Sequence, residues 1–387
     1  MNNTLQNLMR EARQLTQAGQ LNEATAAIQR ALRGASAGYG AETDSVKAWP
    51  RGSASGGASA AASPLVLEGC VFETDAQAPA ATETNIRTDT PGGAGEFTSG
   101  SHTHGTLTRR FKLYTPPGQS DRPMPLVVML HGCTQTPDDF AAGTGMNQRA
   151  REQGFCVLYP EQSQDANPSL CWNWFEHNHQ QRGRGEPALI ASMTQAVVQQ
   201  QGLDPRRVFI AGLSAGGAMA TIVAAAYPEI FAAVGVHSGL PTGAASNVSE
   251  AFMVMRSGEL SIVTRGGGRG AGTATKASQR PRTTVPTIVF HGDQDTTVHP
   301  RNGEQVIAAV MGGSAGGPRV EQGVSARGRR YTRSTRHADH GRALTEHWLV
   351  HGTGHAWSGG RAEGSYTDGS GPDATLEMLR FFFEQRA

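Results

Sequence analysis

The chain has 387 residues, enough for one large domain with additions or for two domains. Its formal net charge is +1, so there is no electrostatic reason to expect a nucleic acid or an anionic membrane as a partner. Hydrophobic residues make up 37% of the chain and charged residues 17%, while there are 49 glycines, so we expect a sizeable part of the chain to lie outside a packed core.

The beginning of the chain gives no sign of export. Met1–Gln20 is polar throughout and contains no apolar segment of the kind found in a secretory signal. No stretch approaches the roughly 20 apolar residues that cross a membrane as a helix. The four cysteines are too few and too scattered for a disulfide scaffold. These features predict a cytoplasmic protein.

Residues 1–33 are predicted to form a short helical hairpin. Apolar residues recur at helical spacing on both sides of Gly19, which breaks the pattern. The pattern resembles a single tetratricopeptide-type hairpin, which cannot bury its apolar face without a neighbour. We therefore expect it to dock on a partner protein, a second copy of the chain or a polymer granule. The alternative is an inert helical leader.

Two regions follow the hairpin. Residues 34–104 are rich in Gly, Ala, Ser, Thr and Pro and are predicted to be a low-complexity linker, because such a composition buries too little apolar surface to offset its ordering entropy. Residues 105–387 are predicted to be one domain in which strands alternate with helices. The glycine-rich segment Gly266–Gly272 interrupts this domain and is interpreted either as lid material or as an unstructured surface loop.

The alternation within residues 105–387 predicts an α/β fold of the α/β-hydrolase type, with a mostly parallel sheet and helices on both faces. The expected strands are Phe111–Tyr114, Pro125–Leu130, Phe155–Tyr159, Arg207–Ala211, Thr287–Phe290 and Glu346–Val350. The expected helices are Asp138–Gln153, Pro187–Gln201, Ala215–Tyr227, Gly303–Met311 and Ala374–Arg386.

Ser214 is the predicted nucleophile. The pentapeptide G-x-S-x-G occurs three times, around Ser36, Ser214 and Ser314. Only Ser214 follows an apolar strand and precedes a helix, the context in which a strained turn projects the hydroxyl from the top of a sheet. The start of the helix also directs backbone N–H groups at developing negative charge. We therefore discard the other two serines.

A serine nucleophile needs a base and a carboxylate that orients the base, and in this fold the chain order is Ser, acid, His. Asp293 and Asp295 both follow the strand Thr287–Phe290. Asp295 is preferred because it lies further into the loop, and Asp293 is expected to tie the turn together. Six histidines follow Asp295, and His355 is the preferred base because glycines flank it on both sides just after the last strand.

The oxyanion hole is expected to use backbone N–H groups near the nucleophile. One donor is Ala215, directly after Ser214. The other is predicted in the loop of His131, Gly132 and Cys133, which follows an early strand, with Cys133 as the donor. Cys133 is interpreted either as a small buried residue or as one half of a disulfide with Cys171.

Together these motifs resemble the poly(3-hydroxybutyrate) depolymerase family of esterases, which includes feruloyl and acetylxylan esterase relatives. The resemblance covers roughly residues 106–387. It rests on the motifs Leu130–Gln135, Cys171–Trp174, Gly212–Gly217, His291–Asp295 and Gly354–Gly360, with Tyr366–Gly369 and Gly371–Ala374 near the end. The oxyanion loop precedes the serine, as in the type 1 arrangement of short-chain polyhydroxyalkanoate depolymerases.

The resemblance implies an esterase with a triad of Ser214, Asp295 and His355 and an oxyanion hole at the loop His131–Cys133. It also raises an extracellular location as an alternative. Secreted depolymerases carry a signal peptide and a C-terminal substrate-binding domain, neither of which we find in this sequence. The expected substrates are therefore oligomers, granules or small esters rather than extracellular crystalline polymer.

The remaining aromatic and polar motifs are less specific. Trp172, Trp174 and Trp357 flank the motifs above and are expected either to form an apolar wall for an acyl group or to pack in the core. Glu176–His179 is interpreted as a polar loop rather than a metal site. No dinucleotide or phosphate-binding fingerprint occurs in the right context, so we expect no cofactor.

Three functions are therefore compared. The first is hydrolysis of 3-hydroxybutyrate polyesters or oligomers, and the second is feruloyl, acetylxylan or general short-chain ester hydrolysis. The third, from another class, is a non-catalytic granule-binding or scaffold protein.

Overall fold

The structure is a computed structural model that describes residues 70–73, 93–118, 122–259, 283–310, 317–338 and 341–385. The predicted hairpin 1–33, most of the predicted linker and Gly266–Gly272 lie outside these ranges. Ser36 and Ser314 lie outside them as well.

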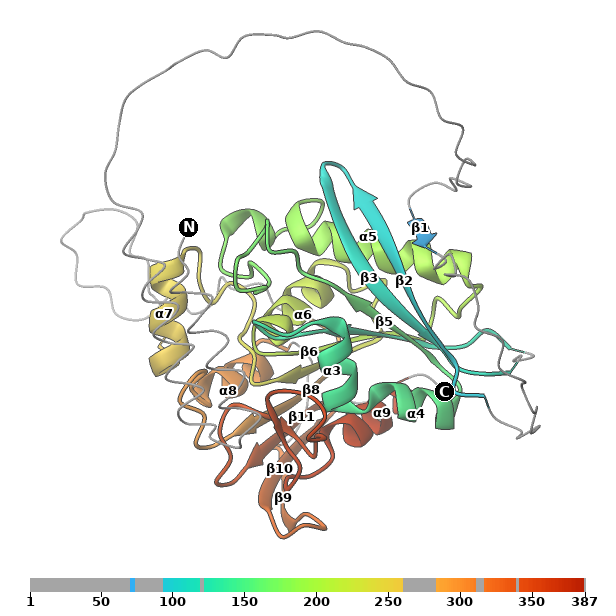
Figure 1. Cartoon of the computed structure of the whole chain (residues 1–387). Helices are drawn as coiled ribbons and strands as arrows, with labels where there is room; N and C mark the ends of the chain where they lie inside the picture. Colours follow the sequence, from blue (N-terminus) through green and yellow to red (C-terminus); the bar gives the residue numbers. More distant parts are fainter. Residues whose placement is uncertain are drawn as a thin grey trace, which may run out of the picture.

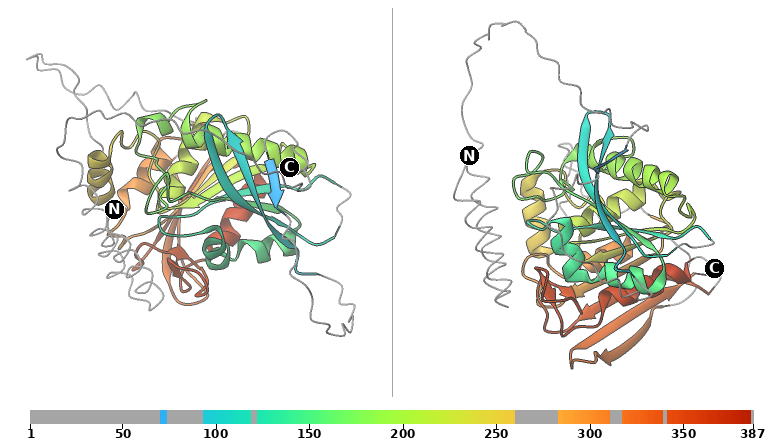
Figure 2. Two further views of the ribbon diagram at one scale, coloured as in Figure 1. Left: turned by 45° about the horizontal axis from the view of Figure 1, so that its top comes forward. Right: turned by 45° about the vertical axis from the view of Figure 1, so that its right-hand side comes forward.

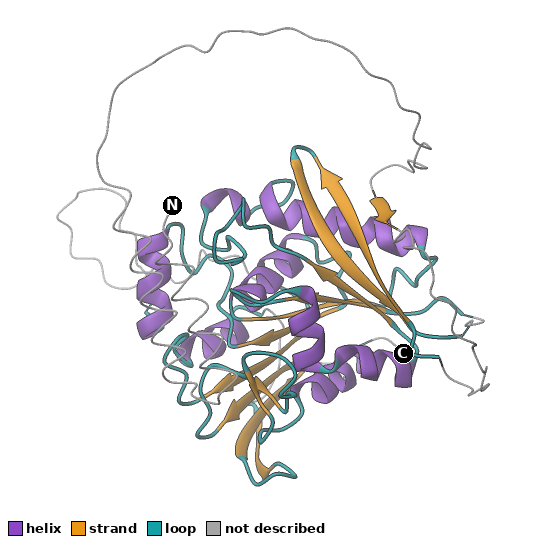
Figure 3. Cartoon of the chain, in the orientation of Figure 1, coloured by secondary structure: helices purple, strands orange, loops and turns teal. Residues whose placement is uncertain are grey.

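A large sheet forms the centre of the domain (Figures 1 and 3). It has eleven strands in the order β1-β2-β3-β5-β4-β6-β7-β8-β11-β10-β9. Its middle part, from β5 to β11, is parallel throughout. The parallel strands are β4 (Leu126–Leu130), β5 (Cys156–Pro160), β6 (Val208–Leu213), β7 (Ala233–His237), β8 (Thr287–Gly292) and β11 (Ala343–Val350).

Antiparallel strands extend the sheet at both ends. They are β1 (Cys70–Glu73), β2 (Glu96–His104) and β3 (Leu107–Thr115) at one end and β9 (Arg319–Val324) and β10 (Arg330–His337) at the other. A separate two-stranded sheet pairs β12 (Trp357–Ser358) with β13 (Thr367–Asp368).

Helices cover both faces of the sheet (Figure 2). One face packs against α5 (Gly185–Gln200), α6 (Ala215–Ala226), α7 (Val248–Ser257) and α8 (Arg301–Ala308). The other packs against α3 (Pro137–Thr144), α4 (Met146–Gln153) and α9 (Ala374–Glu384).

The central strands are apolar on both sides, because both of their faces are covered. In β4, Leu126, Val128 and Leu130 belong to the core beneath α5 and α6, whereas Val127 and Met129 belong to the core beneath α9. A continuous apolar run is what a strand buried on both faces requires. The α/β-hydrolase fold class predicted from the sequence is therefore confirmed.

The sheet begins earlier in the chain than predicted. Residues 96–104, assigned to the linker, form β2 and pair with β3 along their whole length. The many small side chains of this segment indicate a linker by composition alone. In the fold, side chains of the neighbouring strand fill the space beside them. A side chain on Gly100 would lie 2.5 Å from the Phe111 ring, which covers it.

The expected helix Asp138–Gln153 is two helices, α3 and α4. Gly145, with φ of 63°, ends the first helix and begins the second, and glycine adopts this left-handed conformation readily. Among the elements that were not predicted, β7 lies between β6 and β8, the strands that precede the predicted nucleophile Ser214 and the predicted acid Asp295. None of the described helices is long and apolar enough to cross a bilayer.

Candidate active site

Ser214 stands alone between the end of β6 and the start of α6. Its backbone has φ of 56° and ψ of −118°, a strained conformation for a residue with a side chain, and 9% of its surface is exposed. A side chain on Gly212 would overlap the backbone of Gly216, and a side chain on Gly216 would overlap the carbonyl of Leu130. The flanking glycines are therefore required for the turn to pack so close to β4.

Asp295 and His355 lie together at the ends of the neighbouring strands β8 and β11. His355 Nδ1 is 2.7 Å from Asp295 Oδ2, and both side chains are almost fully buried. The second oxygen, Oδ1, accepts backbone N–H bonds from Thr297 at 2.9 Å and Val298 at 2.8 Å. The carboxylate is thus fixed on one side by the backbone and presents its other side to the imidazole.

The charge of Asp295 is strongly favoured in this position. Burial would raise the pKa of this carboxyl, but the neighbouring His355 and His291 hold it well below its usual value. His291 Nε2 lies 3.5 Å from Asp295 Oδ2 and 2.7 Å from the Val298 carbonyl, to which it donates. The sequence analysis gives His291 no role, although its position four residues before Asp295 is a signal.

His237, the last residue of β7, connects the two parts of the site. Its carbonyl accepts the Ser214 N–H at 2.9 Å, and its Nε2 accepts the Ser358 N–H at 2.9 Å. Burial keeps the pKa of His237 well below its ordinary value, with smaller effects from the nearby His291, His355 and Asp295. The segment that carries His355 is therefore fastened next to the Ser214 turn. His237 was missed because β7 was not predicted.

Asp293 occupies a different place. It contacts His351 Nδ1 at 2.9 Å and accepts the Gly352 N–H at 2.7 Å, so it joins the end of β8 to the end of β11. His347 is half-buried in β11, with its Nε2 buried and facing Gly303 of α8. Among the described histidines, His355 and His291 are those in contact with Asp295.

The loop after β4 lies directly over Ser214. A side-chain carbon on Gly132 would be 3.6 Å from Ser214 Cβ. The Gly132 N–H bonds to Gln135 Oε1 at 2.9 Å and the Thr134 N–H to the Ser169 carbonyl at 2.7 Å. Between them, the Cys133 N–H takes part in none of the loop hydrogen bonds found among the described residues.

These contacts show which of the four residues predicted for the oxyanion hole can donate an N–H to a substrate. Ala215 is the first residue of α6, so its N–H has no acceptor within the helix. Cys133 and Ala215 are available as donors, whereas the Gly132 N–H is occupied by Gln135. His131 is buried, which lowers its pKa to about 4. The neutral ring of His131 donates from Nδ1 to the Gly132 carbonyl at 2.8 Å and accepts the Gln162 N–H at Nε2.

Cys133 forms a disulfide with Cys171, 38 residues further along the chain. Of the two interpretations of Cys133, the structure therefore supports the disulfide. The bond connects the loop over Ser214 to the loop that precedes α5.

Strained backbone gathers around this site. The described residues other than glycine with positive φ are Thr134, Leu170, Ser214, Ser238 and Tyr366. Thr134 and Leu170 adjoin the two disulfide cysteines, Ser238 follows His237, and the Tyr366 hydroxyl lies 3.0 Å from Thr134 Oγ1. Such strain persists where the surroundings impose it, which is typical of functional sites.

Residues 109–337, more than half of the chain, match the model of the family described as Esterase PHB depolymerase. The chain belongs to the PHB depolymerase esterase family. The resemblance inferred from the motifs is thereby confirmed.

Individual relatives agree with this assignment. Poly(3-hydroxyalkanoate) depolymerase C from Paucimonas lemoignei is 35% identical over 184 residues, covering 47% of this chain and 43% of the relative. A probable acetylxylan esterase A from Aspergillus fumigatus is 32% identical over 214 residues, covering 52% of this chain and 54% of the relative. The chain thus spans about half the length of these curated relatives.

A solved structure of the acetyl xylan esterase from Aspergillus awamori matches the fold with a TM-score of 0.54 and 21% identity, covering 71% of this chain and 94% of that one. At this identity, the match supports the fold alone.

Three tryptophans of this PHB depolymerase family member flank the motifs of the site. Trp172, Trp174 and Trp357 are 0%, 4% and 1% exposed, and all three belong to the hydrophobic cores. Trp357 packs against the Phe140 ring and donates its indole N–H to Thr375 Oγ1. The structure therefore favours core packing over an apolar wall open to an acyl group.

Proposed function

We propose that this chain hydrolyses carboxylic esters through an acyl-enzyme on Ser214. One observation carries the proposal: the buried hydrogen bond between His355 Nδ1 and Asp295 Oδ2, fastened next to the strained Ser214 turn through His237. A carboxylate that holds Nδ1 as a donor leaves Nε2 of the same ring as a lone-pair base. This is the tautomer that serine activation needs.

In the proposed mechanism, Ser214 Oγ attacks the ester carbonyl while His355 Nε2 takes its proton. The oxygen of the tetrahedral intermediate accepts the N–H groups of Cys133 and Ala215. His355 then protonates the leaving alcohol, and the acyl group remains on Ser214. Water attacks this acyl-enzyme, with His355 again as the base, and the acid is released. Asp295 stabilises the imidazolium at both steps.

For the substrate, we propose polyesters or oligomers of 3-hydroxybutyrate. Membership of the PHB depolymerase family and the similarity to a poly(3-hydroxyalkanoate) depolymerase support this choice. Acetylated or feruloylated carbohydrate esters are the second candidate, because several relatives are named acetylxylan esterases.

The nucleophile is tested with p-nitrophenyl acetate and butyrate. We expect Ser214→Ala to lose almost all turnover, while Ser314→Ala, in the same pentapeptide but a different context, keeps the wild-type rate. A phosphonate inhibitor should label Ser214 in the wild type, as identified by peptide mass. Equal rates for Ser214→Ala and wild type would refute the proposal.

A substrate panel separates the two candidates. We expect faster release of acid from 3-hydroxybutyrate oligomers than from feruloyl esters or acetylated xylan, at equal ester concentration. Faster deacetylation of xylan would instead favour the carbohydrate-ester function.

The non-catalytic alternative and the role of residues 1–33 are tested together. If the chain is a granule-binding scaffold, Ser214→Ala should retain its function in granule association, and deletion of 1–33 should abolish that association. We propose that the hairpin docks on a partner, a second copy or a granule. Unchanged association and oligomeric state after the deletion would support the inert leader.

The cellular location is a further part of the proposal. The sequence predicts a cytoplasmic protein, with an extracellular location as the alternative. The disulfide Cys133–Cys171 supports the alternative, because disulfides persist mainly in oxidising compartments. Alkylation of free thiols during cell lysis, followed by peptide mass measurement, would show whether these two cysteines are oxidised in the host.

A further inference from the structure

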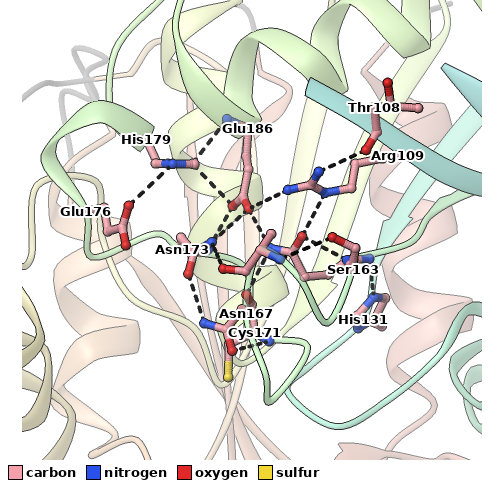
Figure 4. A network of polar contacts seen from close by, with 12 residues as sticks. Thr108, Arg109, His131, Ser163, Asn167, Cys171, Asn173, Glu176, His179 and Glu186 are labelled. Atoms are coloured by element: carbon pink, nitrogen blue, oxygen red, sulfur yellow. Dashed lines mark hydrogen bonds and ion pairs between the residues drawn. The ribbon is translucent and has the colours of Figure 1, made fainter. Parts of the chain in front are cut away.

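Glu186 is a buried carboxylate that the proposed mechanism does not use. It is the second residue of α5 and is 0% exposed. Buried carboxylates are rare unless they are paired and hydrogen-bonded. Figure 4 shows this side chain at the centre of a polar network between the start of α5, the loop before it and β3.

One side of the network holds the loop that contains Cys171. Glu186 Oε2 accepts the Asn173 backbone N–H at 2.8 Å, and Oε1 accepts Asn173 Nδ2 at 3.0 Å. Asn173 lies two residues after Cys171, whose disulfide reaches Cys133. Glu186 is therefore connected through Asn173 and the disulfide to Cys133, whose N–H is the proposed oxyanion donor.

The other side of the network reaches the same loop by a second route. Gln162 Nε2 donates to Glu186 Oε1 at 2.5 Å and to the Cys171 carbonyl at 3.0 Å, while its Oε1 accepts Arg109 Nε at 2.9 Å. The backbone N–H of Gln162 donates to His131 Nε2 at 3.2 Å. His131 in turn holds the Gly132 carbonyl, next to Cys133.

We propose that Glu186 is a positioning residue for the oxyanion hole. From one buried carboxylate, two connections converge on Cys133: hydrogen bonds through Gln162 and His131, and hydrogen bonds to Asn173 followed by the covalent disulfide. Glu186 thereby holds the Cys133 N–H in place in the loop over Ser214. The inference rests on the proposed ester hydrolysis.

A carboxylate suits this position because every group that surrounds it on the loop side is a donor. The ionised form only accepts hydrogen bonds, and here it receives three from Gln162 and Asn173. Burial would raise the pKa of Glu186, but the nearby His179 and the hydrogen bonds from Gln162 and Asn173 outweigh this effect and hold the pKa below its usual value, so the side chain is ionised. An amide of the same shape would turn its own NH₂ group towards one of these donors.

The test compares Glu186→Gln with a matched control, Glu346→Gln. Glu346 is also a buried carboxylate, 3% exposed, and it accepts from Arg380 Nη2 at 2.6 Å and Trp348 Nε1 at 3.1 Å, but it lies towards the start of β11, away from Ser214. Both substitutions are expected to lower the melting temperature. Only Glu186→Gln should reduce catalysis.

The measurements use p-nitrophenyl butyrate, with active sites counted by phosphonate titration. For Glu186→Gln we expect kcat per active site to fall roughly 10- to 100-fold with KM within about threefold, because misplacing one oxyanion donor costs about that much. An alkyl boronic acid, which forms a tetrahedral adduct on Ser214, should bind more weakly by a similar factor. Glu346→Gln should change neither value.

Gln162→Leu keeps the inference testable if Glu186→Gln does not fold. It removes the bond to Glu186 and should lower kcat and boronate affinity in the same way. Unchanged kcat and boronate affinity in the folded variants would overturn the role of Glu186 while leaving ester hydrolysis intact. Full activity in Ser214→Ala would instead overturn the proposed function itself, so the two failures are distinguishable.

Discussion

Two aspartate–histidine pairs lie side by side at the ends of β8 and β11. Asp293 is 2.9 Å from His351 Nδ1, and Asp295 is 2.7 Å from His355 Nδ1. The first pair is 28% and 31% exposed at its side chains, whereas the second is 0% and 5% exposed. The two contacts are thus nearly identical, but the first pair is partly exposed to solvent and the second is buried.

The partners of each pair explain the difference. His351 Nε2 is occupied, 2.9 Å from Thr332 Oγ1, so both of its ring nitrogens are used to tie strands together. His355 has its Nδ1 on Asp295, and its Nε2 has no hydrogen bond to any described residue, which leaves it available for the Ser214 proton in the proposed mechanism. A histidine with both nitrogens committed is structural, and one held at a single nitrogen beside a nucleophile is suited to catalysis.

The strongest test of this comparison exchanges each carboxylate for its amide. Asp295→Asn should lower kcat/KM for p-nitrophenyl butyrate by roughly 10⁴-fold, because an amide NH₂ facing Nδ1 forces the proton onto Nε2, the wrong nitrogen for a base. Asp293→Asn should stay within a few-fold of wild type. Turnover by the two variants, side by side, provides the measurement.

A similar loss in both variants would mean that Asp293 also belongs to the catalytic machinery. A small loss in Asp295→Asn would indicate that another carboxylate orients His355. Circular dichroism of both proteins shows that the comparison is made between folded molecules.

A smaller effect is expected at His291, whose Nε2 lies 3.5 Å from Asp295 Oδ2, the same oxygen that contacts His355 Nδ1. His291→Phe keeps a ring but removes the donor to Val298 and the neighbour of Oδ2. Asp295 keeps its two backbone donors, so we expect kcat to fall only about tenfold, equivalent to roughly 1.4 kcal/mol. His291→Gln restores an N–H donor and should recover part of the rate. No recovery by Gln would argue that the ring shape, not the hydrogen bond, is what matters.

Burial also predicts a pH dependence of stability, through His347 of β11. Burial, with a smaller effect of His291, lowers the pKa of His347 to about 4, below the value of about 6.5 for an unfolded chain. The unfolded state therefore binds the proton first, and this contribution to stability is complete above about pH 6.5 and lost as pH falls towards 4.

Urea titrations between pH 7 and pH 5 test this effect. The unfolding free energy of the wild type should fall as the pH is lowered. In His347→Leu the slope of this fall should be smaller by up to about 1.4 kcal/mol per pH unit, the slope for one proton. Ser214→Ala, which removes no titrating group in this range, should keep the wild-type slope. An unchanged slope in His347→Leu would refute the assignment.

The sequence was most informative where the required conformation or chemistry is open to only one residue type. Gly212 and Gly216 around Ser214, and the order Ser214, Asp295, His355, follow from steric and chemical requirements that are local to each motif. β2 and β7 were missed because their environment comes from elsewhere in the chain, as the Phe111 ring over Gly100 shows.

The network around Glu186 could not be predicted from the sequence for the same reason. Gln162, Asn173 and Glu186 belong to different segments that meet only in the folded protein. The Trp172 and Trp357 positions were ambiguous, because an aromatic next to a motif packs equally well beneath it or beside a ligand.

The smallest expected effect concerns the stability contributed by the exposed pair. In Asp293→Asn, the amide oxygen can still accept the Gly352 N–H, and its NH₂ can donate to His351 Nδ1 if the ring proton moves to Nε2 and bonds to Thr332 Oγ1. All of these hydrogen bonds therefore survive a change of tautomer, and a partly exposed pair contributes little as charges. We expect the unfolding free energy at pH 7 to fall by about 1 kcal/mol or less. The tautomer change that preserves the Asp293–His351 pair is the one that would disable His355 as a base. A small stability loss in Asp293→Asn, together with a large activity loss in Asp295→Asn, would therefore show that the environment of Nε2 distinguishes the two histidines. A loss of several kcal/mol in Asp293→Asn would contradict that explanation.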